Sequence, residues 1–173
     1  MKIGVALSDT DISGVYSYRF LYALNNIHHL SVCGTAALGA MLFAHRLDME
    51  KCDKIAEKFI SHYKKHDIDS AIDLLCDMLP RGKTSGISGI SVHCADTATG
   101  EVFAFCNDNY PFPHKVFPLT NTYDALSSAV GKVYDLAPYR FRGQRLESYS
   151  TKYGAPVYPF DFIAVDKILN TCI

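Results

Sequence analysis

The stretch LSVCGTAALGAMLFA, residues 30–44, carries much of the information about the fold. Its first four residues form a short apolar run that is typical of a buried strand. Gly34 and Thr35 then make a turn, and residues 36–44 are apolar on every side, which indicates a helix enclosed in a core. A strand followed directly by a buried helix predicts an α/β protein.

The flanking sequence continues the alternation of strands and helices. Residues 2–7 predict a strand, and a polar loop at 8–14 leads to a helix that Asp11 or Ser13 would cap. Further along, the patterns predict helices at 49–65 (capped by Asp48), 69–79 and 123–133, and a β-hairpin from 87–94 and 101–106. This order predicts a parallel or mixed sheet flanked by helices. Residues 162–166 fit either a final strand or part of a short helix.

Composition narrows the class of protein. The 173 residues predict one domain, 1–173, and 49% hydrophobic against 20% charged residues excludes a disordered chain. A net charge of −1 argues against a nucleic-acid binder. No apolar run approaches the ~18 residues that a membrane span requires, so we expect a cytoplasmic protein without a transmembrane segment. The six cysteines include no C-x-x-C pair, so we expect reduced thiols, no metal and no cofactor.

Short motifs for other chemistries fail on spacing. Gly82-Lys83-Thr84 resembles the end of a phosphate-binding loop, but Asp77 stands where that loop needs its first glycine. A nucleotide-binding domain is therefore disfavoured. His28 and His29 are adjacent, so their rings diverge, and we expect a solvated turn. The remaining histidines form no ligand pattern; they are His45, His62, His66, His93 and His114.

Several motifs in order resemble the patatin-like phospholipase family. In that family a strand ends in a glycine-rich oxyanion loop, a second strand ends in the nucleophile elbow G-x-S-x-G, and a later aspartate acts as base. Here residues 2–8 resemble the family's first strand, and residues 34–40 resemble its elbow. Residues 95–101 resemble the family's hairpin motif A-T-D-x-x-T-G-E, and residues 149–153 fall on the motif that carries the base. The resemblance implies a three-layer α/β/α fold. It also implies hydrolysis of lipid or other carboxylic esters through an acyl-enzyme.

The family's site residues map onto this chain at named positions. Gly34, Thr35 and Ala37 take the elbow positions, and Ala36 takes the nucleophile's. Thr151 takes the position of the catalytic aspartate. The loop's glycine positions hold Asp9, Thr10 and Asp11, followed by Gly14 as the final glycine.

These departures remove the chemistry that the resemblance implies. Ala36 has no oxygen to attack with, and Thr151 cannot accept a proton at neutral pH. Asp9 and Asp11 would repel an oxyanion, although capping of the following helix is an equally good interpretation. We therefore predict an inactive protein that binds an unknown ligand or protein partner, or self-associates. A cleft rimmed by these aspartates would prefer a cation or amine.

The alternative is an ester hydrolase that uses other residues. Cys33 lies three residues before the elbow position, but strand alternation aims it into the core or at a neighbouring strand. Asp96 and Asp161 fall on family framework positions, and we expect them to make turn and cap hydrogen bonds.

Overall fold

The computed structural model describes residues 3–81, 89–107, 115–133 and 137–153, together with the backbone of 162–165. The strands are β1 Ile3–Asp9, β2 Ile27–Gly34, β3 Gly89–Asp96, β4 Val102–Cys106, β5 Lys115–Pro118, β6 Tyr139–Phe141, β7 Gln144–Ser148 and β8 Phe162–Val165. A 3₁₀ helix, η1 Ile12–Tyr16, precedes α1 Ser17–Ala23. The other helices are α2 Ala36–Ala44, α3 Met49–Tyr63, α4 Ile68–Met78, α5 Thr122–Val130 and α6 Ser150–Tyr153.

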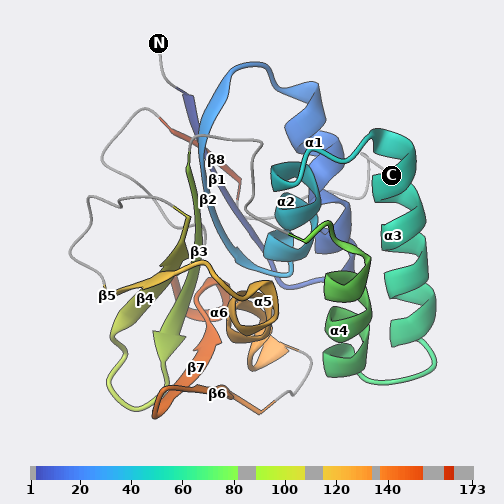
Figure 1. Ribbon diagram of the computed structural model, residues 1–173. Coiled ribbons are helices and arrows are strands. Elements are labelled where there is room, and N and C mark those ends of the chain that lie inside the picture. Colours follow the sequence, from blue (N-terminus) through green and yellow to red (C-terminus); the bar gives the residue numbers. More distant parts are fainter. Residues whose placement is uncertain (1–2, 82–88, 108–114, 134–136, 154–161, 166–173) are drawn as a thin grey trace.

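The strands form one eight-stranded mixed sheet in the order β5-β4-β3-β2-β1-β8, with β7 beside β3 and β6 beside β7. The pairs β1–β2, β1–β8, β2–β3 and β4–β5 are parallel, and β3–β4, β3–β7 and β6–β7 are antiparallel. Figure 1 shows α1 to α5 packed beside this sheet. The predicted α/β class, with a mixed, mostly parallel central sheet flanked by helices, is confirmed and is consistent with a three-layer α/β/α fold.

Local sequence explains where the helices begin. Asp48 caps α3 by accepting a hydrogen bond from Lys51 N at 2.8 Å, as predicted. Asp11 caps η1 in the same way through Ser13 N at 2.9 Å. The fourth helix begins at Ile68 rather than Asp69 because the carboxylate of Asp67 reaches Ser70 N at 2.7 Å. The third helix ends at Tyr63, two residues before its predicted end.

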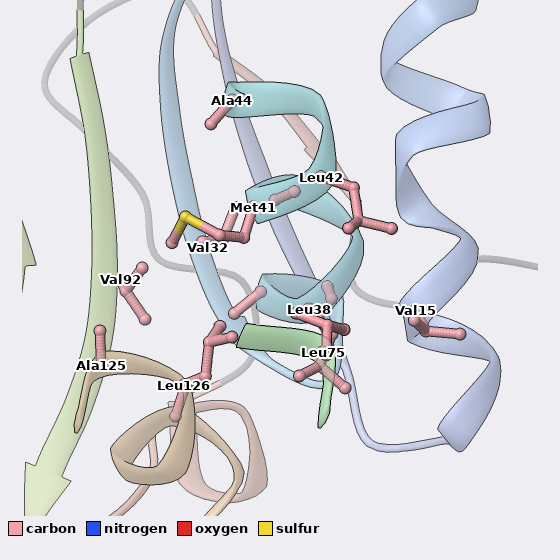
Figure 2. Packing of buried hydrophobic residues seen from close by; sticks show 14 of the residues in the cluster. Val15, Val32, Leu38, Met41, Leu42, Ala44, Leu75, Val92, Ala125 and Leu126 are labelled. Atoms are coloured by element: carbon pink, nitrogen blue, oxygen red, sulfur yellow. The ribbon is translucent and has the colours of Figure 1, made fainter. Parts of the chain in front are cut away.

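The helix α2 is the centre of the core, as its uniformly apolar sequence predicts. Every residue of α2 except Phe43 is buried. Figure 2 shows Met41 directed toward Val32 and Val92 of the sheet, and Leu42 directed toward the helix that carries Val15. Gly39 allows α1 to approach closely, because a Cβ there would lie 2.3 Å from Ser17 Oγ. The sheet and the surrounding helices therefore share one continuous core.

Two further predictions concern the hairpin and the last described strand of the sheet. The predicted hairpin is confirmed as β3 and β4, which pair antiparallel. Residues 162–165, left open between strand and helix, form strand β8 and pair with β1, Gly4 facing Phe162. Within the described ranges, none of the helices combines the length and the apolar character that crossing a membrane requires.

Candidate functional site

The predicted site residues meet at the carboxyl ends of β1 and β2. In the sheet β1 lies between β2 and β8, so the chain connections leave β1 on opposite sides there. Ligands of open α/β sheets commonly bind at such a point. The turn after β2 is held to the loop after β1 by Thr35 N, which donates to Asp9 O at 2.9 Å. The Thr35 hydroxyl also donates to Asp11 O. The loop after β1 and the turn after β2 therefore form one hydrogen-bonded junction.

Two glycines allow the backbone segments of this junction to approach so closely that a side chain at either position would overlap its neighbours. A Cβ on Gly14 would lie 2.4 Å from Thr35 Oγ1 and 2.8 Å from Ala36 N. Gly34 has a left-handed φ of 61°, and a Cβ there would lie 2.0 Å from Asp9 O and 2.3 Å from Ser150 Oγ. Both positions thus require glycine, Gly34 for its conformation as well as for its contacts.

The left-handed residue of the strand-to-helix turn is Gly34, two residues before the position that the resemblance assigns to the nucleophile. In a nucleophile elbow the nucleophile itself occupies the strained turn. Ala36 instead is the first residue of α2, is fully buried, and accepts a hydrogen bond from Ser17 Oγ through its carbonyl at 2.8 Å. Ala37 continues the same helix and is also fully buried.

Of the two loop aspartates, Asp11 caps the following helix, whereas Asp9 makes a turn hydrogen bond within the loop. Asp9 is 3% exposed, and its Oδ1 accepts a hydrogen bond from Asp11 N at 2.9 Å. Asp11 holds Ser13 N as the N-cap of η1. Thr10, between them, is exposed. Within the described ranges, no group of three His, Cys, Asp or Glu side chains could hold a metal ion.

The predicted base position lies in α6, beside the junction. Thr151 is exposed, and its hydroxyl donates to Ser148 O at 2.9 Å. Its neighbour Ser150 is the side chain that approaches Gly34, and its hydroxyl lies 2.7 Å from Ser148 Oγ. Ser150 and Ser148 are not among the predicted site residues; their proximity to the base position Thr151 in the sequence is the only signal that points to them.

A second polar cluster lies on the face of the sheet opposite the apolar core. His93 Nε2 is 3.0 Å from both Ser31 Oγ and Ser91 Oγ, and His29 Nε2 is 3.3 Å from Ser91 Oγ. The ring of Tyr149 lies 5.8 Å from that of His93. Ser31 and Ser91 are fully buried and His93 is 2% exposed. We call Ser31, Ser91, His93 and His29 the polar sheet cluster.

This cluster corrects two sequence interpretations. His28 and His29 lie within β2 and not in a solvated turn, because β2 begins at Ile27 and pairs with both β1 and β3. Burial lowers the pKa of His29 to about 4. His93 had been placed among histidines without a pattern. The alternation His29-x-Ser31 and Ser91-x-His93 was the available signal, since it puts four polar side chains on one face.

The remaining candidate residues have structural roles or lie outside the described residues. Cys33 is fully buried and its Sγ donates to Leu7 O at 3.7 Å, so it is directed at a neighbouring strand as predicted. Asp96 accepts hydrogen bonds from Ala98 N and Thr99 N at 2.7 and 3.0 Å. Burial alone would raise the pKa of Asp96, but backbone N–H groups more than offset this and lower it. Asp161 and residues 82–84 lie outside the described residues.

Two hollows lined by described residues lie away from the junction. One, of about 350 Å³, is formed by the start of α3 and the end of α4. The other, of about 500 Å³, is lined by residues that include Tyr22, Asn26 and Arg46. No protein-family model and no curated protein matches this chain.

Proposed function

We propose that this chain is a catalytically inactive protein with a patatin-like arrangement, which acts by binding a ligand or a partner, or as an assembly subunit. The observation that carries the proposal is the state of Ala36. It stands at the expected nucleophile position, has no nucleophilic atom, and is fully buried at the start of α2.

The hydroxyl groups near the junction do not replace the missing nucleophile. The Thr35 hydroxyl is fully buried and donates to a backbone carbonyl, Asp11 O. The Ser150 hydroxyl pairs with another hydroxyl, that of Ser148. Neither a carbonyl nor a neutral hydroxyl takes a proton from serine or threonine at neutral pH, so these contacts leave both oxygens weak nucleophiles.

Three backbone N–H groups of the junction are also occupied. An oxyanion hole needs N–H groups aimed at the developing charge. Here Thr35 N donates to Asp9 O, Gly14 N donates to Asp11 O, both at 2.9 Å, and Asp11 N donates to the Asp9 carboxylate. Loss of a nucleophile and its base costs a covalent hydrolase orders of magnitude in rate, and loss of the oxyanion donors removes the remainder.

Labelling with a fluorophosphonate, together with turnover of a short-chain ester, tests the proposal. We expect the purified protein to do neither above a heat-inactivated control. We also expect Ala36→Ser with Thr151→Asp to gain little, because the loop donors stay occupied. Covalent labelling of the natural protein would support the alternative ester hydrolase, and Ser150→Ala, Ser31→Ala and Cys33→Ala would then identify the nucleophile.

A binding role has its own readout. A ligand that binds only the folded state raises the melting temperature by an amount that grows with the logarithm of its concentration above Kd. A thermal-shift screen with lipids, nucleotides and divalent cations therefore separates the ligand classes, and light scattering over a range of concentrations detects self-association. A protein that is monomeric and unaffected by every class would contradict self-association and the binding of these ligand classes.

A further inference from the structure

The 350 Å³ groove between α3 and α4 is lined by none of the residues of the elbow or of the loop after β1. Figure 1 shows that α3 begins after the loop that follows α2 and that α4 returns alongside α3 in the opposite direction. Leu47 from that loop, Ile55 of α3 and Leu79 after α4 line the groove. Its volume falls within the range of sites that hold small molecules.

The hydrophobic core opens to solvent at this groove. Leu47, Ile55 and Leu79 are 8%, 7% and 8% exposed, whereas the other fully described members of the core cluster are at most 2% exposed. Met78, which is partly buried and packs against the same core, completes the apolar floor. The three least buried residues of the buried core cluster thus line one hollow, which favours an apolar ligand group there.

Three lysines form the rim of this apolar floor. Lys51, Lys54 and Lys58 follow one side of α3 at helical spacing, and all three line the groove. The acidic residues of the same helix lie elsewhere on it, since neither Glu50, Asp53 nor Glu57 is among the lining residues.

Two of these lysines retain an uncompensated charge within the part of the chain that the structure describes. Lys54 pairs with Glu50 at 2.6 Å, but neither Lys51 nor Lys58 makes an ion pair with a described residue. An apolar floor beside ammonium groups is complementary to a molecule with an alkyl chain and an anionic head.

We propose that this groove binds an amphipathic anion, with its alkyl chain on Leu47, Ile55 and Leu79 and its head group at Lys51 and Lys58. Carboxylate and phosphate heads share the required charge and hydrogen-bond acceptors, and ammonium groups bind both as compact charges. The proposal does not depend on the elbow, so hydrolase activity there would leave it unchanged.

Calorimetric titration with decanoate and decyl phosphate, below their micelle concentrations, tests the proposal. We expect one saturable site for at least one of the two anions, with decan-1-ol and decyltrimethylammonium each binding at least tenfold more weakly. Binding of decanoate alone would assign the site to carboxylates, and binding of decyl phosphate alone to phosphates. Equal binding of the alcohol, or no binding of either anion, would overturn the proposal.

A matched pair of double variants locates the site. Lys51→Gln with Lys58→Gln should weaken anion binding about tenfold, because two exposed charge contacts are lost. Lys64→Gln with Lys65→Gln removes the same charge from the exposed end of the same helix and should leave binding unchanged. Equal weakening in both variants would mean a nonspecific charge effect and would overturn the assignment.

A fluorescent reporter provides a second test. The chain has no tryptophan, so Met78→Trp introduces a single indole at the groove. Saturable quenching or enhancement by the bound anion, reversed by added salt, is expected. Calorimetric binding without any fluorescence change would place the ligand elsewhere. An acidic amphipathic peptide serves as a competitor, and we expect it not to displace the bound anion. Tight binding of the peptide without binding of the anion would overturn the proposal and make the groove a protein-docking surface.

Discussion

In the middle of β2 both faces of the central sheet are buried, but they are stabilised in different ways. Leu30 and Ser31 are consecutive residues of β2 and both are fully buried. Leu30 belongs to the apolar core beside α2, whereas Ser31 joins the polar sheet cluster through His93. Apolar burial stabilises without regard to direction, but buried polar groups stabilise only when their hydrogen bonds are made. Burial alone therefore does not indicate how much a residue contributes.

The largest expected effect is on the apolar face. Leu30→Ala removes a buried side chain that faces Val5 and Ile90 in the strand register, and it should lower the free energy of unfolding by about 2–5 kcal/mol. Urea denaturation measures this loss. Val116→Ala, at a 40% exposed position of β5, is the control and should change stability by less than about 0.5 kcal/mol. Similar losses in both variants would contradict the contrast.

The next effect is a pH dependence that comes from the polar face. Since the pKa of His29 is about 4 in the folded chain and near 6.5 when unfolded, the unfolded state binds more protons between these values. The free energy of unfolding should therefore fall as the pH drops from about 6.5 to 4, by up to about 3 kcal/mol, less what partial exposure of the ring removes.

A histidine variant isolates this contribution. His29→Gln can keep a hydrogen bond to Ser91 and should reduce the pH slope of denaturation midpoints between pH 6.5 and 4. His66→Gln, at an exposed position after α3, is the matched control and should leave the slope nearly as it was. An unchanged slope in His29→Gln would show that the ring is solvated in the folded protein.

The smallest effect is expected from one hydroxyl of the polar sheet cluster. Ser31→Ala removes one of two hydroxyls at His93 Nε2 and leaves Ser91 at 3.0 Å, so it should cost about 1–2 kcal/mol. Ser61→Ala, on the exposed face of α3, should be neutral. A loss as large as that of Leu30→Ala would mean that the cluster, and not the core, dominates the stability of β2.

The sequence predicts the individual helices and strands better than it predicts which strands lie next to one another in the sheet. The core helix α2, the cap at Asp48 and the β3–β4 hairpin follow from apolar periodicity and local hydrogen bonding. The polar sheet cluster combines side chains from β2 and β3, which are separated by three helices, so the relevant strand order had to be known first. His28 and His29 were misplaced for the same reason, because a strand's start depends on the partners it pairs with.

The candidate site shows a similar limit. The order of motifs brought the loop, the elbow and the base position to one edge, and the structure places Asp9, Gly34 and Ser150 in contact there. The order of motifs did not predict that the residue with a left-handed backbone conformation is Gly34. It also did not predict that N–H groups of the loop donate hydrogen bonds to acceptors within the junction. Those features depend on turn geometry, which several sequences of similar pattern can satisfy differently.

The pairing of β1 with β8 has a consequence for biosynthesis. The strand β1 is synthesised before its partner across the Gly4–Phe162 pair, and the chain between them includes every other described strand of the sheet. Until then β1 has an open hydrogen-bonding edge beside an apolar core, which is a template for association between nascent chains. Closure of so long a loop is also slow, so the last step of folding is expected to set the time during which this protein needs protection by chaperones.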